Sequence, residues 1–79
     1  MIVKVLFFGM TADLAGRREL ILSPVNNARC RQVIAEVIDI FPELSKHKVL
    51  YSINQEYAKG DEILNDGDEL AIFTAVSGG

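Results

Sequence analysis

Apolar and polar residues alternate in four stretches of the chain, and an alternation of period two predicts β-strands. The stretches cover residues 2–9, 18–22, 49–54 and 69–76. A very short additional strand is predicted at Tyr57-Ala58. Only residues 10–17 separate the first two stretches, and so short a connection favours antiparallel pairing between them.

The connections between these strands carry turn signals. The segment from Met10 to Gly16 predicts a turn or a single short helical turn, with Thr11 as its cap and Gly16 closing it. Asn65-Asp66-Gly67-Asp68 also predicts a turn, because Asn and Asp bond to nearby backbone and Gly accepts a positive φ.

Residues 27–41 predict one amphipathic helix. Its apolar side chains recur every three or four residues, at Cys30, Val33, Ile34, Val37, Ile38 and Phe41. Asn26 or Asn27 is the predicted N-cap, and Pro42 is expected to end the helix. Cys30 is interpreted as a core residue. The polar link that follows, residues 43–48, contains His47, which we expect at the surface.

This order of elements predicts an α+β fold of two layers. The simplest arrangement is the β-grasp: a mixed sheet of four to five strands, the first and last parallel at its centre, and one main helix on one face. Alternation directs Val3, Val5 and Phe7 of the first strand toward the helix, together with Leu70 and Ile72 of the last. Phe8 and Phe73 then lie side by side on the uncovered face, where aromatic pairs often mark protein contacts. Partial burial of the pair under a loop is the alternative.

Length and composition limit the possible functions. Seventy-nine residues make one domain, and 49% hydrophobic with 24% charged residues is typical of a folded protein. The net charge of −3 argues against nucleic acid and anionic membrane as partners and favours a basic protein surface. The single cysteine excludes an internal disulfide, and the chain shows neither a signal peptide nor an apolar run of about 20 residues. We therefore expect a cytoplasmic protein.

The usual catalytic constellations are absent from the sequence. It has no Ser–His or Cys–His pair with a third orienting group, no Gly-rich phosphate loop followed by Lys, and no metal-ligand spacing. Asp66, Asp68 and Glu69 are close in sequence, but a turn with solvated carboxylates is favoured over an acid–base pair. Metal binding is accordingly not expected.

The chain ends in Val76-Ser77-Gly78-Gly79. Glycine has no Cβ, so a diglycine end is thin enough to thread a narrow tunnel and to present its carboxylate to another protein. Taken alone, the same end also fits a frayed terminus or a cloning remnant.

Four segments together resemble one family. They are Val5-Leu6-Phe7-Phe8-Gly9, Ile53-Asn54-Gln55, the Leu64-x-Asp66-Gly67-Asp68-Glu69 turn and the Val76-Ser77-Gly78-Gly79 ending. The chain is similar over its whole length to the small subunit of molybdopterin synthase (the MoaD family), whose fold is the ubiquitin-like β-grasp. One departure is Thr74-Ala75, where family members often carry prolines. The resemblance implies a single domain over residues 1–79 with a flexible Gly-Gly tail at residues 75–79.

The resemblance also implies a mechanism in which Gly79 is the reacting residue. An ATP-dependent adenylyltransferase of the ubiquitin-activating type would adenylate its carboxylate, and sulfur would then replace AMP to give a thiocarboxylate. Val76, Ser77 and Gly78 would enter a pocket of the large synthase subunit within a heterotetramer. There the sulfur would attack cyclic pyranopterin monophosphate in molybdenum cofactor biosynthesis, with no tightly bound cofactor on the small subunit.

The predicted docking residues for the large subunit are Phe8, Tyr57 and Phe73. Two other functions remain open. One is sulfur carriage for thiamin thiazole synthesis or tRNA thiolation, and the other is a ubiquitin-like modifier or interaction module. All three functions fit the same fold, so the fold does not separate them.

Overall fold

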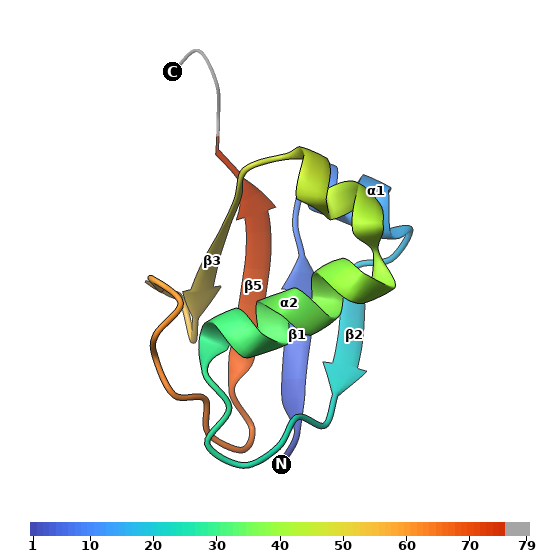
Figure 1. Cartoon of the computed structure of the whole chain (residues 1–79). Coiled ribbons are helices and arrows are strands. Elements are labelled where there is room, and N and C mark those ends of the chain that lie inside the picture. Colours follow the sequence, from blue (N-terminus) through green and yellow to red (C-terminus); the bar gives the residue numbers. More distant parts are fainter. Residues whose placement is uncertain (76–79) are drawn as a thin grey trace.

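The computed structural model describes residues 1–75 of the chain. Over these residues five strands form one mixed sheet in the order β2-β1-β5-β3-β4 (Figure 1). The strands are β1 (Val3–Phe7), β2 (Glu19–Leu22), β3 (Val49–Ile53), β4 (Glu56–Tyr57) and β5 (Glu69–Thr74). The helices are α1 (Met10–Ala15), α2 (Cys30–Ile40) and a 3₁₀ helix, η1 (Pro42–Lys46). The α+β prediction of a mixed sheet with one main helix is confirmed.

The first and last strands pair in parallel at the centre of the sheet, as the pattern predicted. Val5 lies opposite Leu70 and Phe7 lies opposite Ile72. β2 pairs with β1 in antiparallel orientation, and β3 pairs with β5 in the same way. Each of the two central strands therefore has a neighbouring strand on both sides. Their core-facing side chains are covered by α2, which lies across one face of the sheet.

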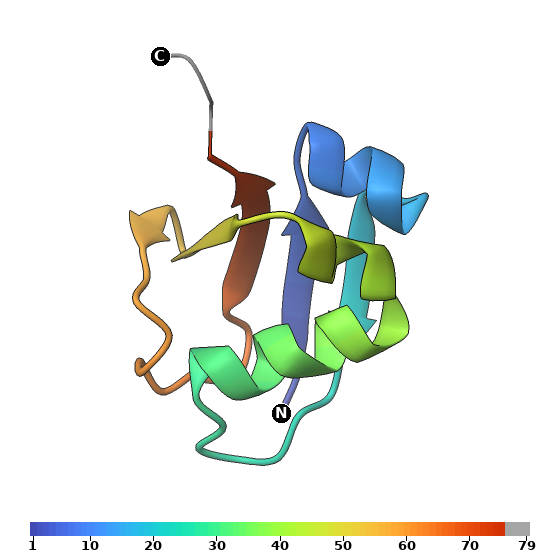
Figure 2. The same ribbon diagram turned by 45° about the horizontal axis from the view of Figure 1, so that its top comes forward.

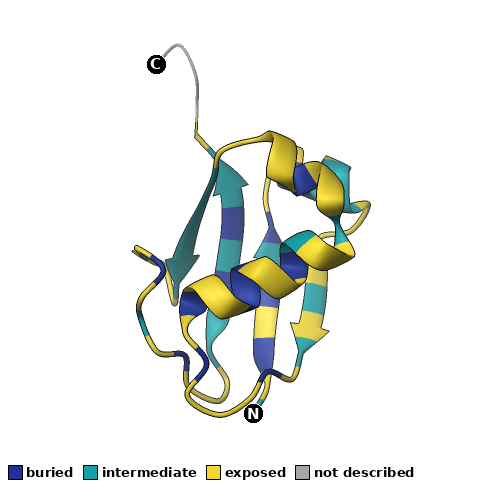
Figure 3. Cartoon of the chain, in the orientation of Figure 1, coloured by how far each residue is buried: buried dark blue, intermediate teal, exposed yellow. Residues whose placement is uncertain are grey.

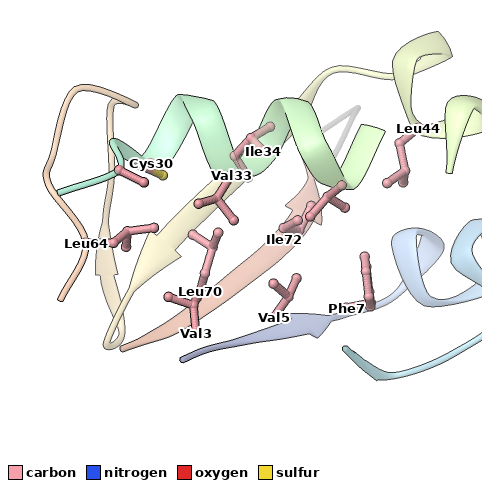
Figure 4. Close-up of a cluster of buried hydrophobic side chains, with 12 residues drawn as sticks. Val3, Val5, Phe7, Cys30, Val33, Ile34, Leu44, Leu64, Leu70 and Ile72 are labelled. Atoms are coloured by element: carbon pink, nitrogen blue, oxygen red, sulfur yellow. The ribbon is translucent and has the colours of Figure 1, made fainter. Parts of the chain in front are cut away.

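α2 crosses one face of the sheet and forms the second layer (Figures 1 and 2). Its sheet-facing side is buried and its outer side is exposed (Figure 3). The core between the layers is apolar and includes the predicted inward residues of β1, β5 and α2 (Figure 4). These residues are Val3, Val5, Phe7, Cys30, Val33, Ile34, Val37, Leu70 and Ile72. Phe41 closes one end of the core, with its ring 5.6 Å from that of Phe7 in an edge-to-face contact.

The start of the main helix was predicted wrongly. α2 begins at Cys30 rather than at Asn27, because Asn27 takes a positive φ of 66° that no helix continues. The backbone N–H of Arg29 donates to the side-chain oxygen of Gln32 at 2.7 Å. The next two N–H groups donate to carbonyls of a distant loop, Cys30 to Glu62 and Arg31 to Gly60, both at 2.8 Å. The helix is thus capped by a loop thirty residues away in sequence, not by an Asn side chain.

The two shorter helices also differ from expectation. The predicted turn after β1 is the six-residue α1, and Gly16 closes it with a φ of 70°, as predicted. Thr11 does not cap it, because Gly9 is the N-cap and Thr11 is buried inside the first turn. The supposedly polar link contains η1, whose Leu44 is buried in the core. His47 is exposed, as predicted.

One predicted turn is found, at residues 65–68, and a second was not predicted, because Asn54 was assigned to the third strand, which ends at Ile53. Asn54 and Gln55 both take positive φ, 49° and 72°, which is the conformation of a two-residue type I′ hairpin turn between β3 and β4. β4 begins at Glu56, one residue earlier than the predicted Tyr57-Ala58. Gly67 takes a φ of 87° in the turn that leads into β5.

Candidate functional site

The central strand β5 runs toward the carboxyl end of the chain and finishes at Thr74, opposite Val49 of β3. In Figure 1 this end of the sheet lies at the top, opposite the N-terminus. Ala75 follows and is exposed. The predicted reacting residue Gly79 and the predicted insertion residues Val76, Ser77 and Gly78 lie outside the described residues. The structure therefore gives the point from which they extend, and their roles stay predictions.

The sheet face opposite α2 is covered by no helix of residues 1–75 (Figures 1 and 2). Leu6 of β1, Ala71 and Phe73 of β5, and Leu50 and Ser52 of β3 alternate with core residues and so share this face. Each of them is partly exposed. We call this surface the open face.

Two of the three predicted docking residues, Tyr57 and Phe73, are in contact on the open face, and Phe8 lies at the end of β1, beside β5. Phe8 directly follows β1, and its N–H donates to the carbonyl of Ile72 at 3.1 Å, extending the parallel ladder by one residue toward Phe73. Tyr57 packs against Phe73, with ring centroids 5.9 Å apart and planes at 61°. Phe8 is 52% exposed and Tyr57 81%. Phe73 is only partly exposed, and the ring of Tyr57 lies against it.

Two further apolar residues of this face were not among the predicted docking residues. Leu6 lies on the side of β1 that alternation assigns to Phe8. Leu50 lies directly opposite Phe73 on β3, and only the strand register shows that proximity. A hollow of about 240 Å³ adjoins Phe8, and its lining residues come from the end of β1 and the start of β2. They are Leu6, Phe7, Phe8, Gly9, Arg18 and Glu19.

The segments that resemble the family at Ile53-Asn54-Gln55 and Leu64–Glu69 are hydrogen-bonded to each other. The Asn54 side chain donates to Asp68 Oδ1 at 3.0 Å and accepts from the backbone N–H of Glu69 at 3.0 Å. Asp66 Oδ1 accepts from the N–H of Ile2 at 2.6 Å. These bonds join three parts of the chain at the end of the sheet away from Thr74. We call this group the clasp, and its role is structural.

The other acidic contacts of this region are also hydrogen bonds from backbone N–H groups. Asp68 Oδ2 accepts from the N–H of Asn65 at 2.7 Å, which supports the interpretation of this segment as a turn. Glu62 accepts from the N–H groups of Lys59 and Gly60, both at 2.8 Å. These backbone donors lower the pKa of the Glu62 carboxyl, so it remains a carboxylate at neutral pH. A hollow of about 400 Å³ between the β3–β4 hairpin and this loop is lined by Glu62 and Asp68 among others.

No catalytic group is found in the part of the chain that the structure describes. Burial, with a smaller effect from the Glu62 charge, raises the pKa of the Cys30 thiol to about 11, so this cysteine is not a nucleophile at neutral pH. Over residues 1–75 no three His, Cys, Asp or Glu side chains gather as a metal site would require. None of the described helices has the length and apolarity needed to cross a membrane.

The chain is similar to known proteins over nearly its whole length. Residues 5–79 match the ThiS family. The chain belongs to this family. It is 34% identical to the molybdopterin synthase sulfur carrier subunit of Chlamydomonas reinhardtii, over 98% of both chains. Against the protein of the same name from Escherichia coli, strain K12, the identity is 35% over 98% of this chain and 99% of that one.

Solved structures agree with the fold. A putative molybdopterin converting factor subunit 1 from Pyrococcus furiosus is 28% identical, with a TM-score of 0.89 over 96% of this chain and 99% of that one. Small archaeal modifier protein 1 from Haloferax volcanii is 26% identical, with a TM-score of 0.88 over both complete chains. A chain in the complex of subunits 1 and 2 of molybdopterin-converting factor from Helicobacter pylori shares the fold at 21% identity and a TM-score of 0.66, over the full length of both.

Proposed function

We propose that this ThiS-family chain is the sulfur-carrier subunit of molybdopterin synthase. Its C-terminal glycine, as a thiocarboxylate, donates sulfur to cyclic pyranopterin monophosphate in molybdenum cofactor biosynthesis. The observation that carries the proposal is the identity of 34–35%, over nearly the whole chain, to relatives named as such carriers, in a sequence that ends in Gly78-Gly79.

The proposed chemistry uses the terminal carboxylate, an activating enzyme with ATP, a source of sulfur and the large subunit. The Gly79 carboxylate attacks the α-phosphorus of ATP on an adenylyltransferase of the ubiquitin-activating type, giving an acyl adenylate and pyrophosphate. Hydrosulfide then attacks the acyl carbon and displaces AMP, which leaves the thiocarboxylate and a proton. The carrier itself holds no cofactor in this scheme. ATP is bound by the activating enzyme.

The fold allows the tail to enter a partner's pocket while the folded body stays outside. Five residues follow Thr74, and fully extended they reach about 17 Å at ~3.3–3.6 Å per residue. The terminus can then enter a pocket of the large subunit while the body, with its open face, docks outside. Enclosure in that pocket excludes water from the reactive acyl group. The large subunit is the expected docking partner, within a cytoplasmic heterotetramer.

The test is the intact mass of the protein purified from its native host. Replacement of one carboxylate oxygen by sulfur adds about 16 Da, and the added mass should localise to the C-terminal peptide. An activated carrier incubated with purified large subunit and cyclic pyranopterin monophosphate should return to its original mass as the product forms. A native protein that never carries the added sulfur would contradict the proposal.

A second candidate rests on a specific observation. Small archaeal modifier protein 1 matches the fold over both complete chains at 26% identity, and its name describes a protein modifier. A modifier would be found as isopeptide conjugates to lysines of other proteins, detectable as Gly-Gly remnants on lysine after proteolysis. Conjugates that depend on Gly79 would favour this function, whereas their absence together with the added sulfur favours the carrier.

A further inference from the structure

Thr11 is the only polar residue buried in the core region of residues 1–75, with none of its surface exposed. Its hydroxyl lies among three backbone groups at the end of the sheet from which the chain continues past Thr74. The hydroxyl oxygen accepts from the N–H of Phe8 at 3.0 Å. The hydroxyl can donate to the carbonyl of Phe8 or to that of Ile72, each at 2.8 Å. One side chain of α1 thus joins the end of β1 to the last part of β5.

The two residues that Thr11 joins lie at the end of β1 and near the end of β5. Phe8 is one of the three aromatic residues on the open face, and Ile72 precedes the end of β5 by two residues. Beyond Phe8 the chain turns sharply at Gly9, whose φ of 58° and ψ of −128° leave the β region. β1 therefore ends before Phe8. The backbone of Phe8 is held by the Thr11 hydroxyl, by its own N–H, which donates to the Ile72 carbonyl at 3.1 Å, and by the Thr11 N–H, which donates to the Phe8 carbonyl at 3.2 Å.

We propose that Thr11 is a positioning residue, whose buried hydroxyl fixes Phe8 of the docking surface relative to the strand that delivers the tail. The inference rests on the proposed function, because it assumes that the open face docks the large subunit while the tail enters it. Docking of the open face and insertion of the tail must then occur together. A loosely held Phe8 would weaken the docking of the open face without altering the tail.

Two substitutions separate this role from simple core packing. Thr11→Val keeps the volume and branching of the side chain but removes the hydroxyl. The backbone groups around it still have partners, because Thr11 N–H donates to the Phe8 carbonyl at 3.2 Å and Phe8 N–H donates to Ile72 at 3.1 Å. The Val variant should therefore fold. Thr11→Ser keeps the hydroxyl and loses only a methyl group, so it is the matched control.

The experiment measures docking and local order in the full-length chain. A binding titration with purified large subunit should show about a tenfold loss of affinity for Thr11→Val, equivalent to about 1.4 kcal/mol. Thr11→Ser should bind within about threefold of the wild-type chain. In the free proteins, amide hydrogen exchange at Phe8 should be faster in the Val variant than in the Ser variant, while the core amide of Val5 serves as an internal reference.

The outcomes are distinguishable. If the wild-type chain does not bind the large subunit, the proposed function is refuted, and the docking role of Thr11 with it. If the wild-type chain binds and the Val and Ser variants bind equally well, Thr11 has no positioning role although the proposed function stands. The same conclusion follows if both variants lose affinity in proportion to a loss of Val5 protection, because the effect is then one of stability. The inference is supported if only the Val variant loses affinity for the large subunit and exchanges the Phe8 amide faster.

Discussion

Replacement of Tyr57 by Ala tests whether the open face is the docking surface. Tyr57 is 81% exposed, so most of its ring is free to be buried by a partner. Burial of about 100 Å² of apolar surface at ~25 cal/mol/Å² corresponds to about 2.5 kcal/mol. Central aromatic anchors commonly cost about 2 kcal/mol or more on truncation, so association with the large subunit should weaken at least ~30-fold.

The same substitution should affect folding much less. In the free chain the ring of Tyr57 makes one edge contact, with Phe73 at 5.9 Å, and an aromatic pair of this kind contributes about 0.5–1.5 kcal/mol. Tyr57 is preferable to Phe73 for this test, since the ring of Phe73 is already partly buried in the free chain. The free energy of unfolding, from a urea melt, gives the correction to be applied to the affinity.

Ile40 provides the matched control. It lies on the outer side of α2, in the other layer of the molecule, and is 49% exposed. Ile40→Ala should leave both affinity and stability nearly unchanged, because alanine is a good helix former and the open face is untouched. Equal affinities for the Tyr57→Ala and Ile40→Ala variants would refute the assignment of the docking surface to the open face.

Three further predictions concern the tail and the core. Deletion of Gly79, or addition of one residue after it, should abolish sulfur transfer without changing the melting temperature, since the nucleophile moves by about 3.5 Å; transfer that survives extension would contradict this. Val37 is fully buried, so Val37→Ala should destabilise the fold by roughly 2–3 kcal/mol in a urea melt, and a loss below about 0.5 kcal/mol would place it outside the core. The pKa of the Cys30 thiol is about 11 in the folded chain, against 9.0 for a free thiol. Between pH 9 and pH 11 this thiol is therefore more often protonated in the folded state than in the unfolded state. Stability should therefore fall by roughly 2–3 kcal/mol as pH rises through this window, and a Cys30→Ala variant with the same pH dependence would exclude the thiol as the cause.

The layout of the core could be predicted because it depends on periodicity. Val3, Val5 and Phe7 alternate with polar or exposed positions, and Cys30, Val33 and Val37 recur at helical spacing. Each pattern leaves one face to be buried, and the simplest way to cover both is to lay the helix across the sheet. The predicted arrangement included the parallel pairing of the first and last strands, which the structure has.

What could not be predicted depends on contacts between distant segments. The N-terminus of α2 is capped by carbonyls of Gly60 and Glu62, and no local signal near residue 27 indicates this. Leu44 is buried within a segment whose neighbours are polar, because η1 folds back over the end of the core. Thr11 is a residue type that often caps helices, but its hydroxyl donates to the carbonyl of Ile72 in β5, 61 residues further along the chain.

The composition of the open face was predicted in part. Phe8 and Phe73 followed from alternation, whereas the contact of Tyr57 with Phe73 required the register of the β3–β4 hairpin, in which Ser52 pairs with Tyr57. That register is determined by the positive φ values of Asn54 and Gln55, which are visible in the sequence only as a preference.

Two of the four motifs by which the sequence resembles its family are structural, namely Ile53-Asn54-Gln55 and the Leu64–Glu69 turn. The clasp of Asn54, Asp66 and Asp68 lies at the far end of the sheet from the tail and does no chemistry, yet it fixes where β5 begins. A slip of one residue between β5 and its neighbours would turn Phe73 from the open face toward the helix, and it would move the point at which the tail leaves the sheet by about 3.3 Å. In the proposed function, docking of the large subunit on the open face and the reach of the tail both depend on that register. The clasp thus stabilises the register on which the proposed sulfur carriage relies.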